Sequence, residues 1–198
     1  MNLIDKLIEI GKEVHSRNWV PATGGNLSAK INEERIIITR SGSHKGYLTV
    51  KDFVVVDMNG NLVEGDGKPS AETLLHATVY KLFPWVGSVL HIHSLNSTLI
   101  SRLTDGQIVL EDYELIKAFG YKTHRERIHV PVLENSQDME ELSRLVRDVL
   151  TGTDKVVGFI LRSHGVYVWG KDPWDAFVRL EALDFLLECE LKLMGVRS

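Results

Sequence analysis

The sequence holds a single cysteine, Cys189, so no disulfide can form within the chain. Such a scarcity of thiols is typical of a reducing compartment, and we expect a cytoplasmic protein. A surplus of basic charge is also missing, because 23 Lys and Arg residues stand against 27 Asp and Glu residues. This balance argues against nucleic acid as a partner. The same charge balance still allows an anionic small molecule as substrate, since a binding site needs only a few hydrogen-bond donors close to the anion.

Long apolar runs are missing as well. Charged residues interrupt the amino-terminal stretch MNLIDKLIEIGKEV, which is therefore not typical of a signal peptide. No other run approaches the roughly 20 apolar residues that cross a bilayer, so we expect no membrane partner. The chain also shows no internal repeat, linker or low-complexity tract. With 43% hydrophobic residues and an ordinary length, residues 1–198 are expected to form one domain.

Helical and strand patterns alternate along the chain. Helical spacing predicts helices at 3–17, 69–83, 94–103, 111–120, 136–150 and 172–195. Strands are predicted at 26–31, 35–39, 86–93 and 127–133, with a hairpin at 53–64 and a broken pair at 156–170. We expect Asn59-Gly60 to turn the hairpin, Pro173 to open the last helix and Gly195 to end it. The interleaved order predicts an α/β fold in which helices cover both faces of a mixed sheet.

Two histidines lie one residue apart in the stretch SVLHIHS. Side chains alternate between the faces of a strand, so His91 and His93 are expected to point the same way. A catalytic zinc usually takes three ligands from the protein. His164 in RSHGVYVWG, at the end of an apolar strand and before a glycine, is the best third candidate. The residues alone leave two interpretations open, a metal clamp or polar side chains on a wet sheet face.

Two glycine-rich stretches, PATGGNLSAK and TRSGSHKG, offer backbone N–H groups to an anion. A serine at the start of the predicted helix PSAETLLHATVYKLF adds a hydroxyl and a helix N-terminus. Each stretch alone is as typical of a turn as of a phosphate site, but together they predict a phosphorylated substrate. Neither has the spacing of an ATP or dinucleotide loop. The candidate phosphate-binding residues are Gly25, Asn26, Ser41, Gly42, Lys45 and Ser70.

Taken in order, TGGNLS, TRSG, PSAE, HIHS and RSHGVYVWG resemble the class II aldolase superfamily over nearly the whole chain. The resemblance implies a three-layer α-β-α sandwich with a mostly antiparallel central sheet, commonly assembled as a homotetramer. It implies that one divalent metal ion, usually Zn²⁺, binds His91, His93 and His164. The positions implied to contact substrate phosphate are Asn26, Ser41, Gly42 and Ser70. With this resemblance, the metal clamp becomes the favoured interpretation.

Within the superfamily, the closer resemblance is to the branch that dehydrates a methylthio-substituted ketose 1-phosphate in methionine salvage. The stretches that carry it are NWVPATGGNLS, SGSHKG, PSAETLLH, YELIKAFG and LRSHGVYVWG. This branch implies a zinc-dependent hydro-lyase with a phosphorylated ketose as substrate. An aldolase that cleaves a ketose 1-phosphate is the alternative, because both reactions use the same metal and phosphate sites. A non-catalytic scaffold, as in the adducin head, is disfavoured because such a protein should have lost its metal ligands.

Two glutamates are candidates for the acid/base. In the aldolases the glutamate of a motif like PSAE takes this role, which implies Glu72. In the animal dehydratase a segment resembling YELIKAFG carries it, which implies Glu114. For dehydration we favour Glu114 as the proton shuttle and keep Glu72 as the second candidate. A partly desolvated carboxyl with a raised pKa would suit both steps. His76 lies four residues after Glu72 on the same helix face and could line the site, but we expect it on the helix surface.

Overall fold

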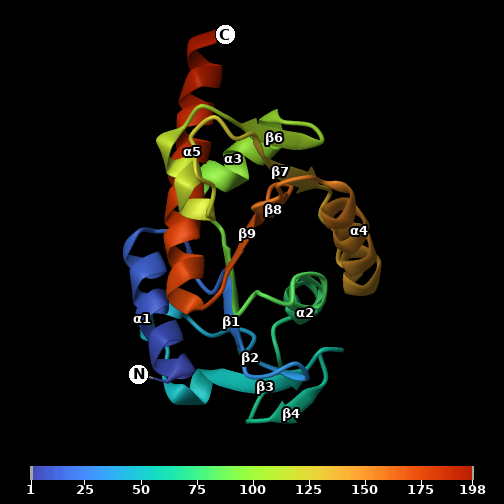
Figure 1. Ribbon diagram of the computed structural model, residues 1–198. Coiled ribbons are helices and arrows are strands. Elements are labelled where there is room, and N and C mark those ends of the chain that lie inside the picture. Colours follow the sequence, from blue (N-terminus) through green and yellow to red (C-terminus); the bar gives the residue numbers. More distant parts are fainter. Residues whose placement is uncertain (1, 198) are drawn as a thin grey trace.

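A computed structural model describes residues 2–197, and within them the centre is one nine-stranded sheet (Figure 1). The strands are β1 (Asn26–Lys30), β2 (Arg35–Thr39), β3 (Phe53–Asp57), β4 (Leu62–Glu64), β5 (Ser88–Ile92), β6 (Gln107–Leu110), β7 (Ile128–Leu133), β8 (Gly158–Leu161) and β9 (Gly165–Gly170). They lie in the order β4-β3-β2-β1-β5-β9-β8-β7-β6. β7 and β8 pair in parallel, and the other neighbouring pairs are antiparallel. The expected mostly antiparallel sheet is therefore confirmed.

Helices cover both faces of the sheet. On one face an apolar core includes residues of α1 (Leu3–Ser16), α3 (Leu95–Leu103) and α5 (Pro173–Arg197). The core on the other face includes residues of α2 (Thr73–Leu82) and α4 (Met139–Gly152). Figure 1 shows the sheet curving around α2 and α4, with α1 and α5 on its outer side. The arrangement is the expected α-β-α sandwich.

Alternation along β1 separates the two faces. Leu27 and Ala29 are buried in the core with α1 and α5. Ser28 between them is also buried but points the other way, toward His76 and Tyr80 of α2. The α2 face of this central strand therefore carries polar groups, and this is the face on which the candidate site forms.

Local signals placed many of the element boundaries, but several differ from prediction. The helix predicted at 111–120 is only a short 3-10 helix at Glu114–Phe119, and the helix predicted from residue 136 begins at Met139. Gly60 turns the β3–β4 hairpin with a φ of +84°, as expected. α2 begins at Thr73 rather than near residue 69, because the residues before it form a turn with Glu72 at the N-cap position. β6 was not predicted, since a four-residue strand shows too little alternation to recognise. α5 continues through Gly195, because a glycine weakens a helix by roughly 1 kcal/mol but does not stop it.

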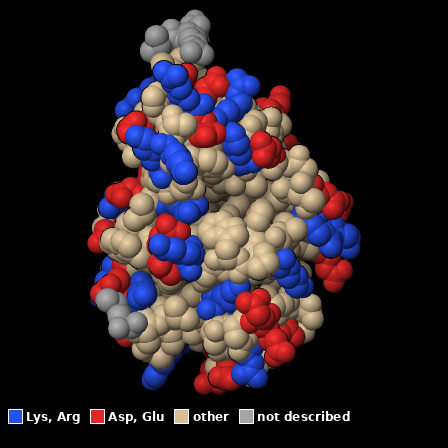
Figure 2. Space-filling model, in the orientation of Figure 1, with Lys and Arg blue, Asp and Glu red and all other residues tan. Residues whose placement is uncertain are grey.

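Charged side chains of both signs are spread over the face shown in Figure 2, around a hollow of uncharged residues. Across residues 2–197, none of the helices combines the length and the apolar character that a bilayer span requires.

Candidate metal centre

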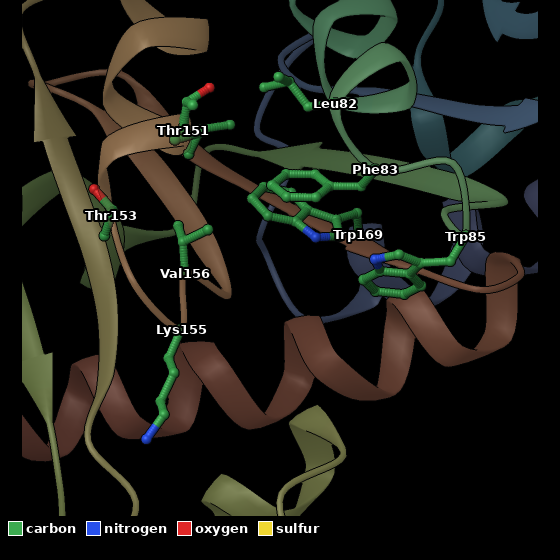
Figure 3. A pocket seen from close by; sticks show the side chains of 9 residues that line it. Leu82, Phe83, Trp85, Thr151, Thr153, Lys155, Val156 and Trp169 are labelled. Carbon is green, nitrogen blue, oxygen red and sulfur yellow. The ribbon is translucent and has the colours of Figure 1, made fainter.

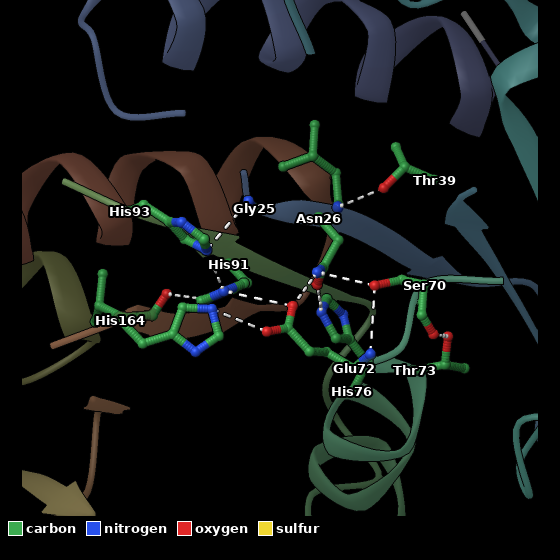
Figure 4. Close-up of polar contacts among 12 residues, drawn as sticks. Gly25, Asn26, Thr39, Ser70, Glu72, Thr73, His76, His91, His93 and His164 are labelled. Carbon is green, nitrogen blue, oxygen red and sulfur yellow. Dashed lines mark hydrogen bonds and ion pairs between the residues drawn. The ribbon is translucent and has the colours of Figure 1, made fainter. Parts of the chain in front are cut away.

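Three neighbouring strands align the side chains of the site. β5 pairs with β1 on one side and with β9 on the other, so Asn26 lies opposite His91 and His91 lies opposite Tyr167. Residues paired directly across antiparallel strands point to the same face of a sheet. The row faces the amino-terminal end of α2, where Glu72 stands (Figure 4).

The three predicted histidines converge, and we call His91, His93 and His164 the histidine cluster. Their ligand nitrogens, one from each ring, lie within 4.8 Å of one another. His91 belongs to β5, His93 directly follows that strand, and His164 lies in the turn before β9. The Nε2 atoms of His91 and His93 are 2.9 Å apart. Nδ1 of His91 donates to the carbonyl of Val166 at 3.0 Å, which leaves its Nε2 as the bare nitrogen that faces the cluster.

The donor set of the histidine cluster fits a divalent metal ion. Burial lowers the pKa of His93 to about 4 and the pKa of His91 well below its usual 6.5, so both rings are neutral near pH 7. Nε2 of His93 accepts from the backbone N–H of Gly25 at 3.2 Å, so it is bare like Nε2 of His91, and two bare nitrogens at 2.9 Å repel each other unless a cation lies between them. The buried Nδ1 of His164 finds no hydrogen-bond partner among the described residues. Three imidazoles are a ligand set of catalytic Zn²⁺ sites, although they also suit other transition metals.

Glu72 is the carboxylate at this centre. Its side chain is 13% exposed, and its Oε1 lies 3.0 Å from Nε2 of His164. Its Oε2 lies 3.5 Å from Nε2 of His91. Burial raises the pKa of Glu72, but the hydrogen bonds from His164 and from the amide of Asn26 lower it more, and its pKa lies well below 4.5. The expectation of a raised pKa does not hold for this carboxylate, because the buried site also supplies donors.

Glu114 lies in a different setting. It is the first residue of the short 3-10 helix η3 (Glu114–Phe119), and 72% of its side chain is exposed. Its partners in the described part of the chain are Lys117, in an ion pair, and Nδ1 of His124 at 3.9 Å. The hydrogen bond from Lys117 lowers the pKa of Glu114. The structure does not bring this carboxylate to the histidine cluster of its own chain.

A cleft of about 270 Å³ opens beside the cluster, and His93 and Glu72 form part of its wall. All the residues predicted to bind phosphate line this phosphate cleft, namely Gly25, Asn26, Ser41, Gly42, Lys45 and Ser70. Gly42 has a φ of +79°, a conformation that glycine adopts without strain. The structure therefore brings the predicted metal and phosphate residues together.

Lys45 joins the two glycine-rich loops from behind the cleft. Its buried Nζ donates to the carbonyls of Thr23, at 2.7 Å, and Ser43, at 2.8 Å. Burial lowers the pKa of Lys45 to about 8, although the charge of Glu72 raises it. Arg40 also lines the cleft, with its guanidinium 3.3 Å from Asp52. Arg40 was not predicted as a cleft residue, although it directly precedes Ser41 in the motif TRSG, and this position could have indicated it.

Two further residues of the site were also missed. His76 was expected on the helix surface, but this is wrong, because its side chain is fully buried against β1. Its spacing of four residues from Glu72 was the available signal, since one helical turn places both on the same face. The ring of Tyr167 stacks on that of His91, with centroids 3.9 Å apart and planes 12° apart. Tyr167 belongs to RSHGVYVWG, the motif from which only His164 was taken.

Another pocket, of about 430 Å³, lies beside the stacked rings of Phe83 and Trp169, whose centroids are 5.3 Å apart (Figure 3). Its wall is mostly apolar, with Trp85 and Lys155 also lining it. None of the residues predicted for metal, phosphate or proton transfer lines this pocket. The histidine cluster and the phosphate cleft therefore remain the candidate site.

The sequence matches the family model of the class II aldolase and adducin N-terminal domain over residues 5–191. It is 47% identical to methylthioribulose-1-phosphate dehydratase of Methylococcus capsulatus, covering 97% of this chain and 94% of that protein. A protein of the same name from Pseudomonas aeruginosa is 44% identical, covering 98% of this chain and 96% of that one. These relatives span nearly the same length as this chain.

Solved structures share the fold at lower sequence identity. YgbL from Klebsiella pneumoniae superposes with a TM-score of 0.81 and 23% identity, over 96% of this chain and 89% of its own. L-fuculose-1-phosphate aldolase from Thermus thermophilus gives a TM-score of 0.79 and 22% identity, over 98% of this chain and 96% of its own. Sheet order, histidine motifs and sequence similarity agree, and the chain belongs to the class II aldolase and adducin family.

Proposed function

We propose that this chain is a metal-dependent dehydratase, a hydro-lyase that converts 5-methylthioribulose 1-phosphate to 2,3-diketo-5-methylthiopentyl 1-phosphate and water. The observation that carries the proposal is the Glu72 carboxylate, which lies between the histidine cluster and the phosphate cleft. The identity of the substrate is supported by the relatives, which carry the name of this dehydratase and match along nearly the whole chain. The reaction would belong to methionine salvage.

The parts of the site divide the work between binding and proton transfer. The histidine cluster would hold the metal ion, and the phosphate cleft would hold the phosphate group. A divalent ion bound there would supply Lewis acidity toward the carbonyl oxygen on carbon two of the substrate. Fixing the phosphate at one end restricts the sugar chain, so that one carbon–hydrogen bond faces the base.

In its ionised form, Glu72 is suited to remove the proton from carbon three. The same carboxyl then donates that proton to the hydroxyl on carbon four, the carbon–oxygen bond breaks, and water leaves. The enol that remains becomes the 2,3-diketone when its hydroxyl proton is lost and carbon four gains a proton. The lowered pKa of Glu72 favours the basic form that begins this sequence.

Glu114, which the sequence favoured as the proton shuttle, becomes the second candidate here, in a different arrangement. Because it lies away from the cluster of its own chain, it could act only at the cluster of a neighbouring subunit. Its exposure leaves the carboxylate accessible for such a contact. A homotetramer, the predicted assembly, would provide the neighbour.

Zinc, the homotetramer, the cytoplasmic location and the single domain are parts of the same proposal. The three imidazoles support Zn²⁺ as the metal. Exposed Leu95, Leu99 and Leu103, one turn apart along α3, support an interface between subunits. The single thiol supports a reducing compartment.

The test is to incubate the purified, metal-loaded protein with methylthioribulose 1-phosphate and to identify the products by mass spectrometry. We expect a product whose mass is that of the substrate minus one water. A reagent that reacts with neighbouring carbonyl groups should trap this product, because it is a diketone. An aldehyde and a shorter ketose phosphate would instead indicate the aldolase reaction. A protein with full metal content that converts nothing would contradict both activities. Metal analysis of the untreated protein tests zinc separately.

A further inference from the structure

A chain of hydrogen bonds runs from Glu72 into the space between the sheet and α2. Nδ2 of Asn26 donates to Oε2 of Glu72, and Oδ1 of Asn26 contacts Nε2 of His76 (Figure 4). Nδ1 of His76 lies 2.7 Å from Oγ of Ser28, which lies 2.8 Å from the hydroxyl of Tyr80. The four residues beyond Glu72 are at most 4% exposed, so water does not compete for these bonds.

The chemistry of the groups fixes the direction of the bonds around Asn26. Its Nδ2 can only donate, and it has two acceptors, Oε2 of Glu72 and Oγ of Ser70 at 3.0 Å. Its Oδ1 can only accept, so Nε2 of His76 must carry a proton. Each polar atom of the Asn26 side chain therefore has a partner of the right kind.

The remaining bonds follow from the state of His76. Burial lowers the pKa of His76 to about 4, so the ring is neutral near pH 7 and carries one proton. With that proton on Nε2, Nδ1 is bare and accepts from the hydroxyl of Ser28. The edge of the ring also packs against Tyr167, with centroids 5.7 Å apart and planes at 73°. The orientation of the His76 ring is thus held from two sides.

We infer that His76 is a positioning residue that acts on Glu72 through Asn26. Its Nε2–H donates to Oδ1 of Asn26 and so favours the one orientation of the amide in which Nδ2 faces Glu72. The flipped amide would set Oδ1 against the carboxylate and Nδ2 against a donor, and both contacts are repulsive. His76 does not line the phosphate cleft, so its effect on the reaction passes through the amide rather than through the substrate. The inference rests on the proposed role of Glu72.

Two substitutions of His76 test the inference in the full-length, metal-loaded protein. His76→Leu removes the donor, whereas His76→Gln keeps an N–H near the position of Nε2. In His76→Leu the Asn26 amide is free to turn away from the Glu72 carboxylate. We expect kcat to fall about tenfold or more, which corresponds to losing the hydrogen bond from Asn26 to that charged group. KM and metal content should change less than twofold. His76→Gln should recover most of kcat. Tyr80→Phe changes the last residue of the hydrogen-bond chain, and its kcat should stay within twofold of that of the unaltered protein.

A nitrogen NMR measurement of the imidazole tautomer provides a readout that does not depend on turnover. We expect the unaltered protein to show a protonated Nε2 and a bare Nδ1 at His76. The opposite tautomer would overturn the inference, as would normal kcat in His76→Leu or a His76→Gln variant no faster than His76→Leu. If His76→Leu does not fold, the tautomer still decides, because it is measured in the unaltered protein.

Glu72→Gln separates this inference from the proposed function. If Glu72→Gln is inactive while His76→Leu is normal, only the positioning role of His76 fails. If Glu72→Gln turns over normally, the proposed proton shuttle fails as well. Because His76 acts through Glu72, the variant with both changes should be no slower than Glu72→Gln alone.

Discussion

Glu72 and Glu114 both stand at the start of a helical segment, yet their environments are opposite. The side chain of Glu72 is 13% exposed and contacts His91, His164 and Asn26, which belong to distant parts of the chain. The side chain of Glu114 is 72% exposed, and its ion-pair partner Lys117 is only three residues away. The difference shows that tertiary neighbours, not the local sequence, decide which of two similar carboxylates meets a reactive centre.

The topology of the sheet explains the difference. The amino-terminal end of α2 faces the row that crosses β1, β5 and β9, so groups from three strands and their turns reach Glu72. η3 instead packs on α5, where the hydroxyl of Tyr113 donates to Glu190 at 2.6 Å. This contact holds the helix in place while the carboxylate of Glu114 remains at the surface.

The largest expected effect comes from removing a histidine from the Glu72 region. His91→Ala or His93→Ala should abolish both bound metal and turnover, because two remaining imidazoles leave the ion with too few protein ligands. Metal analysis together with the dehydration assay checks this. His124→Ala, beside Glu114, is the matched control and should keep its metal. A His91→Ala protein with full metal content would show that the cluster is not the metal site.

The next effect distinguishes the two glutamates directly. Glu72→Gln and Glu114→Gln make the same chemical change, and each should leave bound metal unaltered. We expect kcat of Glu72→Gln to fall about 10²–10⁴-fold, the usual contribution of a general acid–base. We expect kcat of Glu114→Gln to stay near normal. The reverse result would assign the proton shuttle to Glu114, acting at a neighbouring subunit.

The same contrast explains how far sequence alone could predict this molecule. Period-2 spacing placed His91 and His93 together, and the order of motifs added His164 and the loops of the phosphate cleft. Which carboxylate meets the cluster could not be predicted, because it depends on how α2 and η3 pack against strands far away in sequence. His76 was misplaced for a related reason. Helical spacing predicts on which side of α2 His76 lies. It does not predict that polar residues of β1 cover that side.

A smaller effect is expected at the back of the cleft. Lys45→Met preserves the length of the side chain but leaves the carbonyls of Thr23 and Ser43 without their buried donor. The free energy of unfolding should fall by about 1–3 kcal/mol, the cost of unpaired buried polar groups. Urea unfolding of the metal-free protein measures it. Lys51→Met, at an exposed lysine nearby, is the control and should change stability by less than about 0.5 kcal/mol. Equal stabilities would show that Lys45 does not tie the loops together.

The last effect is a pH dependence of stability that comes from the buried histidines. The folded protein lowers the pKa values of His76 and His93 to about 4, from 6.5. Below pH 6.5 the unfolded chain therefore binds protons that the folded, metal-free chain does not. Stability should be complete above about pH 6.5 and should decline as the pH falls toward 4. Each such histidine contributes a slope of about 1.4 kcal/mol per pH unit. His76→Gln should remove one such contribution from urea unfolding curves measured between pH 7 and 5, and an unchanged slope would mean that His76 is not held neutral in the fold.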